Sequence, residues 1–237
     1  MPDFHNPTGR LMANGCRQHI SAIASKRGCR LIVDETMIDL WLDVPRPISM
    51  AAFDREGHVI TLGSMGKSFW GGLRIGWVRA SRDIIAALSA SRAANDMGSP
   101  ILEQLAATAL LRRPDDILDE RRQAIREQRD HLLGLVSERL PDWRFERPPG
   151  GLSAWAELPR PLCSALAVAA HDLGVRIAPG SRFGVGGAFE RFVRLPYALP
   201  TTVLSDVVDR LAQAWADVSA SGKRRTAAAT VQLTEAI

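Results

Sequence analysis

The chain has 237 residues, of which 46% are hydrophobic and 24% charged, a composition typical of a globular protein and not of a disordered one. No apolar run approaches the ~20 residues that span a bilayer and the N-terminus has no signal pattern, so we expect no membrane role. The net charge of +4 is too mild to indicate nucleic-acid binding, and three cysteines without disulfide or metal-ligand spacing favour a cytoplasmic protein with no metal site.

The first 113 residues are predicted to form part of an α/β domain. A helical pattern ends at Gly28, two short apolar runs follow as buried parallel strands, and a third strand precedes a long helix that is interrupted near residues 98–100. These elements are expected at residues 10–27, 30–34, 58–62, 73–78 and 82–112. Alternation of this kind is typical of an α/β layer with a mainly parallel sheet.

The remainder is predicted to contain a connecting helix, a small domain and a tail. Residues 114–140 are helical and heavily charged, which indicates a connecting helix with one solvated face. Residues 141–218 alternate short strands, at 143–146, 152–158, 175–177 and 191–195, with helices at 161–173 and 200–218, as in a compact α+β domain. Residues 219–237 are rich in Ala, Thr and Ser, and we expect them to be disordered.

Two polar features lie where an open α/β sheet places its ligands, at the carboxyl ends of predicted strands. Asp34 ends an apolar strand, so it is expected to be a buried carboxylate that needs a cationic partner, such as a protonated pyridine nitrogen. Asn6 belongs to the turn Asn6-Pro7-Thr8-Gly9, and its amide either enters a cleft or only helps the chain into the next helix.

A third feature combines Ser64, Lys67 and Arg74 just after another strand. A lysine in a sheltered position loses its proton readily and condenses with an aldehyde as a Schiff base, while the Arg74 fork suits a dianionic phosphate. The sequence Gly66-Lys67-Ser68 also permits a nucleotide-binding phosphate loop. That alternative is disfavoured because the first glycine of the motif would fall at Ile60-Thr61.

These residues are followed along the chain by Gly150-Gly151 and by Arg194 in Phe192-Val193-Arg194-Leu195. In order and spacing, the whole set resembles the signature of class I/II aminotransferases. The resemblance implies pyridoxal 5'-phosphate as cofactor, with Lys67 as the catalytic Schiff-base lysine. It also implies that Asp34 pairs with the pyridine nitrogen and that Asn6 donates to the ring's phenolic oxygen. Ser64 and Arg74 would hold the phosphate, and Arg194 would take the substrate's α-carboxylate.

The segment 63–77 is similar to the effector domains of MocR-type transcriptional regulators, in which an aminotransferase-like domain follows a GntR-like winged helix. The similarity runs from residue 2 to about 218. Aminotransferases usually carry a tyrosine two or three residues after the pyridine-binding aspartate, and here Thr36 and Met37 occupy those positions. The family also has more of the large domain before the Asn-Pro-Thr-Gly turn, so the chain is expected to be an N-terminally truncated form.

Three functions therefore stay open. The chain is an enzyme that moves amino groups between an amino acid and a 2-oxo acid, a domain that senses an amino acid or amine, or an inactive fragment. The resemblance implies a homodimer. It implies contact with DNA only through a winged-helix domain that this sequence lacks.

Overall fold

The computed structural model describes residues 3–96 and 98–234, with side chains described up to residue 220. The backbone divides into two compact units. The first consists of the residues up to Arg126 together with Pro148–Gly151, and the second of Glu127–Arg147 together with the residues from Leu152 onward. Helix α5 (Pro114–Arg139) therefore contributes to both units, whereas the sequence pattern predicts a separate connecting segment.

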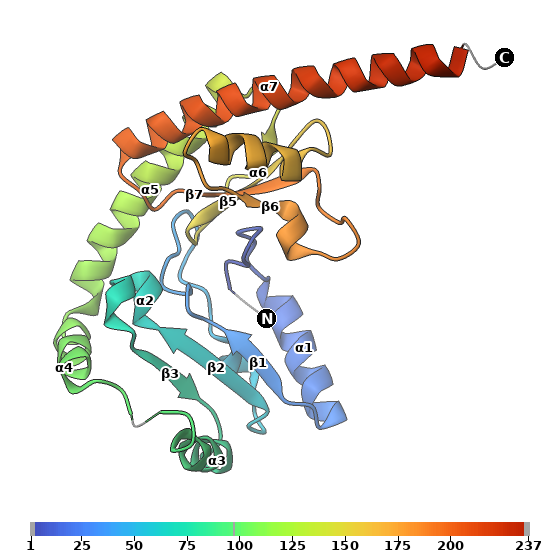
Figure 1. The fold of residues 1–237 in the computed structure, drawn as a ribbon. Coiled ribbons are helices and arrows are strands. Elements are labelled where there is room, and N and C mark those ends of the chain that lie inside the picture. Colours follow the sequence, from blue (N-terminus) through green and yellow to red (C-terminus); the bar gives the residue numbers. More distant parts are fainter. Residues whose placement is uncertain (1–2, 97, 235–237) are drawn as a thin grey trace. The chain divides into compact units, whose positions relative to one another are not determined.

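The first unit contains a three-stranded sheet with the order β1-β2-β3 (Figure 1). Strands β1 (Leu31–Asp34) and β2 (Val59–Ser64) are parallel, as predicted, and β3 (Gly76–Arg79) is antiparallel to β2. The third strand starts three residues later than predicted because Arg74 has a left-handed backbone, with φ of 52°, which interrupts the extended chain. The parallel pair brings the carboxyl ends of β1 and β2 to one edge of the sheet.

The 3-10 helix η1 (Met50–Phe53) packs against this sheet, and helix α1 (Asn14–Arg27) packs against η1. Val33 and Val59 form a buried cluster with Met50, and the Ser21 hydroxyl donates to the Phe53 carbonyl over 2.9 Å. The helix ends at residue 28 as predicted, where glycine adopts the left-handed conformation of a C-cap. It begins later than residue 10 because the preceding residues close a turn.

The segment between β2 and β3 folds into two short helices, α2 (Met65–Ser68) and η2 (Gly71–Leu73). They meet in a second buried cluster, formed by Met65 and Leu73 with Ala107 of α4 (Ile101–Leu110). The predicted interruption near residues 98–100 is confirmed, because α3 (Arg82–Arg92) and α4 are separate helices and Pro100 is the N-cap of α4.

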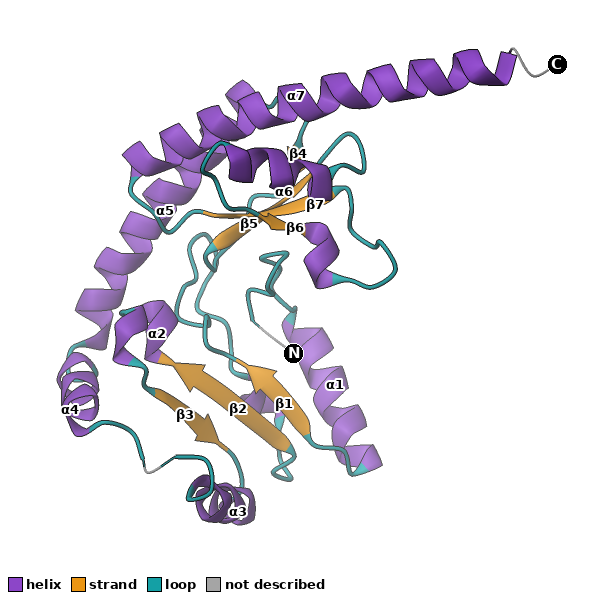
Figure 2. Ribbon diagram, viewed as in Figure 1, coloured by secondary structure: helices purple, strands orange, loops and turns teal. Residues whose placement is uncertain are grey.

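The second unit contains a four-stranded antiparallel sheet with the order β4-β5-β7-β6. Figure 2 shows helices α6 and α7 on one side of this sheet. The elements are β4 (Arg144–Phe145), β5 (Ser153–Glu157), α6 (Cys163–Asp172), β6 (Ala178–Pro179), the 3-10 helix η3 (Gly180–Phe183), β7 (Phe192–Pro196) and α7 (Thr201–Thr234). This is the predicted α+β unit.

Two boundaries in this unit differ from the prediction. Strand β6 lies three residues beyond the predicted 175–177, because Gly174, with φ of 77°, and Val175 still donate to the last carbonyls of α6. Helix α7 continues to Thr234, so the segment from 219 that is predicted to be disordered is helical to that point; residues 235–237 lie outside the described part. Among the helices of the described residues, none is long and apolar enough to cross a bilayer.

Candidate functional site

The Asp34 side chain is exposed at the carboxyl end of β1, which corrects the expectation of a buried carboxylate. Strand alternation explains the difference: Val33 faces the core, so Asp34 shares the opposite face with Ile32, which is 57% exposed. The Thr36 N–H donates to Asp34 Oδ1 over 2.9 Å and orients the carboxylate. The side chain is accordingly accessible to a ligand without being part of the core.

The next residue along the chain, Glu35, is a buried carboxylate that the sequence pattern does not single out. Its Oε1 accepts hydrogen bonds from the Ser49 hydroxyl, over 2.9 Å, and from the Met50 N–H, over 2.8 Å. Burial nevertheless raises the pKa of the Glu35 carboxyl, because desolvation outweighs these two bonds. The alternation of side chains along an extended chain is the signal that would have assigned burial to Val33 and Glu35 instead of Asp34.

Lys67 lies in α2, which begins directly at the end of β2. The Ser64 hydroxyl accepts from the Gly66 N–H over 3.1 Å and caps this short helix, so serine favours the turn that presents Lys67. The Lys67 side chain is exposed, and Ser64 is half-buried. Asp34, the last residue of β1, is opposite Leu62 in the parallel register. Strand β2 continues for two more residues, so Ser64 lies at the same edge of the sheet as Asp34.

Arg74 follows η2 and is held next to α2 by the backbone. The Met65 N–H donates to the Ile75 carbonyl over 3.0 Å, and a Cβ added to Gly66 would lie 3.8 Å from the Gly71 Cα. Arg74 is exposed, and its left-handed φ of 52° is uncommon for a residue with a side chain. The structure therefore brings the segments of Ser64, Lys67 and Arg74 together.

Asn6 lies in a closed turn, in which the His5 N–H donates to the Arg10 carbonyl over 2.9 Å and the His5 imidazole bonds to the Thr8 hydroxyl over 2.9 Å. The Asn6–Pro7 peptide is cis, and the Asn6 side chain is exposed. The segment is tied to the end of β1 because the Asp3 N–H donates to the Asp34 carbonyl over 3.0 Å. Asn6 thus belongs to a segment attached to the strand that ends in Asp34.

The predicted pair Gly150-Gly151 packs against Phe4, at the base of the same turn. A Cβ on Gly150 would lie 2.3 Å from the Phe4 ring and 2.6 Å from the Leu40 carbonyl oxygen, so only glycine fits there. Gly151 has φ of 81°, and its N–H donates to the Leu40 carbonyl over 2.9 Å. These glycines are needed for close packing behind the Asn6 turn.

Arg194 is half-buried on β7 of the second unit, opposite Trp155 in the antiparallel register. Its guanidinium carbon lies 5.3 Å from the centre of the Phe183 ring. Five of the six predicted residues therefore lie in the first unit, at the carboxyl ends of β1 and β2 or in segments attached to them. Arg194 is the predicted residue of the second unit.

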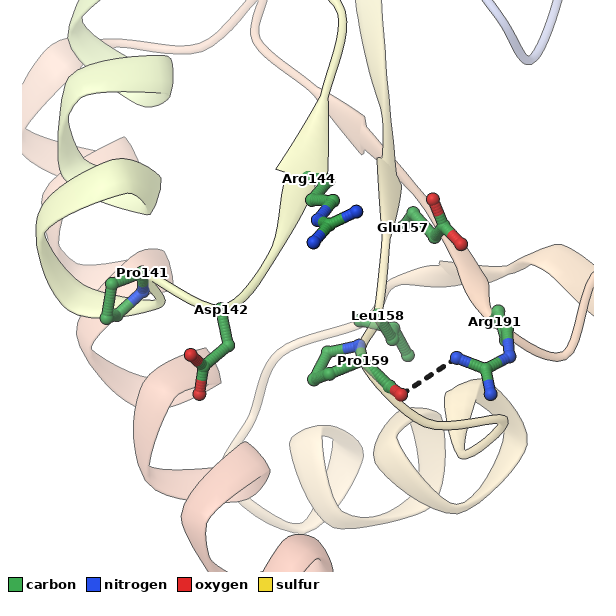
Figure 3. Close-up of a pocket in the computed structure, with 7 residues that line it drawn as sticks. All are labelled: Pro141, Asp142, Arg144, Glu157, Leu158, Pro159 and Arg191. Carbon is green, nitrogen blue, oxygen red and sulfur yellow. Dashed lines mark hydrogen bonds between the residues drawn. The ribbon is translucent and has the colours of Figure 1, made fainter.

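The cavities that we find in the described residues do not coincide with these side chains. One of about 540 Å³ in the first unit is lined in part by Glu35, Thr61 and Trp77, and a groove of about 460 Å³ in the second unit is lined in part by Arg144 and Arg191 (Figure 3). In the groove Arg191 donates to the Pro159 carbonyl over 2.8 Å. Within the described residues, no group of three or more His, Cys, Asp or Glu side chains could hold a metal ion.

Comparison with known proteins identifies the fold. A family model described as aminotransferase class I and II matches residues 3–211. The 2-aminoadipate transaminase of Thermus thermophilus is 30% identical over 221 residues, which cover 90% of this chain and 56% of that protein. The HTH-type transcriptional regulator YisV of Bacillus subtilis is 33% identical over 160 residues, or 65% of this chain and 33% of that protein.

The solved structures agree. The crystal structure of LysN, the α-aminoadipate aminotransferase of Thermus thermophilus in complex with N-(5'-phosphopyridoxyl)-L-leucine, matches with a TM-score of 0.86 and 29% identity, over 93% of this chain and 58% of that one. The chain thus spans between a third and three fifths of the length of these relatives. The predicted fold, that of pyridoxal-phosphate-dependent aminotransferases, and the likeness to HTH-type regulators are both confirmed. The chain belongs to the aminotransferase class I and II family.

Proposed function

We propose that the chain is a pyridoxal-phosphate-binding aminotransferase domain in which Lys67 is the residue that attaches the cofactor. The observation that carries the proposal is the β2–α2–η2 segment, which presents an exposed amine, a hydroxyl and a guanidinium at Lys67, Ser64 and Arg74. The end of the neighbouring parallel strand adds the exposed Asp34 carboxylate. Ligands of open α/β sheets bind at this edge.

The chemistry of this set of side chains fits the cofactor. A primary amine takes an aldehyde, Arg74 and the Ser64 hydroxyl take a phosphate, and Asp34 holds a proton on a pyridine nitrogen. Asn6 would donate to the phenolic oxygen. When bound, the cofactor supplies an electron-withdrawing ring that stabilises negative charge at the substrate Cα. Lys67 then moves the proton at that carbon, and Arg194 orients the substrate through its α-carboxylate.

A sensing role is the second candidate, and two observations favour it. Thr36 and Met37 occupy the positions where aminotransferases usually place a phenol, and Tyr197, the one tyrosine of the chain, is fully buried in the second unit. The relatives include transcriptional regulators as well as a transaminase. In this function the same site binds an amino acid or amine and biases a DNA-binding domain. A homodimer and a cytoplasmic location are further expectations for either function.

Reductive trapping tests the cofactor site. The full chain is incubated with pyridoxal 5'-phosphate, reduced with borohydride and digested, and the labelled peptide is identified. Label on Lys67, lost in Lys67→Ala and retained in Lys26→Ala, is the expected result, because Lys26 is an exposed lysine at the end of α1 and serves as a matched control. Label that stays in Lys67→Ala overturns the assignment.

The two functions are separated by turnover. The chain that carries the borohydride-reduced cofactor is compared with the cofactor-loaded chain for turnover of a panel of amino acids and 2-oxo acids. Multiple turnovers support the enzyme. A change in cofactor absorbance on adding an amine, without turnover, supports the sensor, and an absence of cofactor binding supports neither.

A further inference from the structure

Arg194 lies on the face of the second unit's sheet that is turned away from its helices. In the β5·β7 register it is the partner of Trp155, so both side chains share one face. The residues beside them in sequence, Ala154, Ala156, Val193 and Leu195, are buried on the other face. Figure 2 shows α6 and α7 covering that side. The half-buried Trp155 and Arg194 therefore belong to the opposite face of the sheet.

Trp155 is the centre of an aromatic cluster that also contacts Arg194. Trp155 stacks on Phe192 with the ring centres 5.2 Å apart, and it meets Phe183 edge-on at 5.6 Å and Phe189 at 6.1 Å. Phe183 also faces the arginine, whose guanidinium carbon is 5.3 Å from the ring centre. The Phe183 ring thus contacts both Trp155 and Arg194.

The backbone holds Phe183 firmly in this place. Phe183 ends η3, and the glycines on both sides of it pack closely on the following loop: a Cβ on Gly180 would lie 2.2 Å from the Phe189 carbonyl oxygen, and one on Gly184 would lie 2.8 Å from the Phe189 ring. The other end of the loop is fixed because Glu190 accepts hydrogen bonds from the first residues of α6. The segment that carries Phe183 is therefore closely packed on the loop that contains Phe189 and Glu190.

We propose that Phe183 is a positioning residue for Arg194: its ring holds the guanidinium plane so that the N–H edges are presented to a ligand carboxylate. This rests on the role of Arg194 in the proposed function. An aromatic ring binds a guanidinium through its face, whereas a carboxylate takes two N–H groups in the plane. The two contacts are compatible because they use different parts of the guanidinium. The contact with the Phe183 ring restricts the Arg194 side chain beforehand, so less side-chain entropy is lost when the carboxylate binds.

The test measures how much a carboxylate contributes to binding, without any reaction. Two probes are titrated into the full chain: N-(5'-phosphopyridoxyl)-L-leucine and its counterpart without carboxylate, N-(5'-phosphopyridoxyl)-3-methylbutylamine. The ratio of their dissociation constants reports the carboxylate alone. We expect a preference of roughly tenfold or more for the leucine conjugate, since a bidentate charged contact is formed, and its loss in Arg194→Leu.

Phe183→Leu should lower this ratio by about three- to tenfold, while Phe183→Tyr, which retains a ring, should preserve it. Phe192→Leu is the matched control, because Phe192 belongs to the same aromatic cluster and its ring stacks on Trp155 and meets Phe189. It should leave the ratio unchanged. If Phe183→Leu is poorly folded by circular dichroism, Phe183→Met replaces it.

The outcomes separate the two proposals. An unchanged ratio in the folded Phe183→Leu or Phe183→Met variant overturns the role of Phe183 and leaves the cofactor site intact. Equal weakening of both probes also overturns it, because a merely structural residue would act on both. Failure of the wild-type chain to bind either probe overturns the proposed function and this inference with it.

Discussion

Asp34 and Glu35 are adjacent carboxylates in opposite environments. Asp34 is exposed at the strand end, and Glu35 is buried against Ser49 and Met50. A substitution of Asp34 consequently changes the chemistry of the site without disturbing the core, whereas a substitution of Glu35 changes stability. Each residue therefore allows a prediction that isolates one effect.

For Asp34→Asn we expect an unfolding free energy within ~0.5 kcal/mol of wild type, because the amide oxygen still accepts from the Thr36 N–H and the site is exposed. Half-transamination in the cofactor-loaded chain should slow by on the order of a hundredfold, because a neutral amide no longer holds the proton on the pyridine nitrogen. Single-turnover absorbance measures this rate. Asp39→Asn, which alters a carboxylate paired with Arg46, is the control; an unchanged rate in Asp34→Asn at normal loading contradicts the pairing.

For Glu35 the prediction concerns pH. Burial raises the pKa of this carboxyl above its ordinary value of 4.5, so the folded state binds the proton more tightly than the unfolded state does. The contribution of Glu35 to stability is therefore fully present below pH 4.5 and is lost as the pH rises through the raised pKa. Glu35→Gln keeps an acceptor for Ser49 and Met50 and carries no charge, so it should remove this loss.

Urea unfolding at a series of pH values from about pH 4 to about pH 8 measures the effect. Glu35→Gln should match wild type at the acidic end and be at least as stable at neutral pH. A variant that is clearly less stable than wild type at neutral pH would show that the ionised carboxylate stabilises the fold, contrary to the desolvation argument.

At the scale of elements, the N-terminus of helix α6 is capped by a side chain from a loop that is distant in the sequence. Glu190 accepts from the Ser164 N–H over 3.2 Å, from the Cys163 thiol over 3.3 Å and from the Ser164 hydroxyl. The Ser164 hydroxyl, followed by the Cys163 thiol, holds the pKa of Glu190 below its ordinary value despite partial desolvation. A carboxylate at a helix N-terminus also interacts favourably with the helix dipole.

Glu190→Ala should therefore lower the unfolding free energy by about 1 kcal/mol at neutral pH, the usual size of a lost N-terminal cap. Because the folded-state pKa is depressed, this stability is present above pH 4.5 and is lost as the pH falls through the lowered pKa. The difference between variant and wild type should shrink at low pH. Glu157→Gln, on β5 of the same unit, is the control. An equal loss of unfolding free energy in this variant would mean that removing any carboxylate destabilises the unit and would contradict a capping role for Glu190.

Elements were predictable from the sequence where one local signal dominates. Helix α5 has the predicted range because Pro114 starts it and a charged helical pattern continues to Arg139. The strands ending at Asp34 and Ser64 were predictable as short apolar runs, and their parallel pairing follows from the α/β alternation. The small domain was predictable down to the order of its strands and helices along the chain.

Predictions failed where tertiary context decides. The left-handed Arg74 and the bonds that extend the end of α6 displaced β3 and β6, and neither leaves a mark on hydrophobic periodicity. Asp34 was predicted to be buried because an apolar run precedes it, although alternation assigns the core to Val33. The roles of Asn6, Asp34, Ser64, Lys67, Arg74 and Arg194 toward a cofactor and substrate stay predictions. The structure adds where each side chain lies.

For the whole molecule, the distribution of exposed apolar side chains is informative. In the described part of the first unit, Ile32 on β1 and Trp77 and Val78 on β3 are exposed, although sheets with parallel strands usually have both faces covered. Helix α4 exposes Ile101, Leu102 and Leu105 on one face, with Leu102 at 78%. Exposed apolar surface of this extent is typical of an interaction site.

We therefore expect the chain to associate at micromolar concentration, with α4 as part of the contact. The double variant Leu102→Lys/Leu105→Lys should shift the chain toward monomer without lowering its unfolding free energy by more than ~0.5 kcal/mol, because both side chains are already in water in the isolated chain. Light scattering after size exclusion, at several concentrations, measures the mass. Val168→Lys is the matched control, since it places a lysine at an exposed apolar position of α6 in the second unit. Association that is equally reduced by Val168→Lys would point to a general effect of charge, and a wild-type chain that is monomeric at every concentration would contradict the prediction.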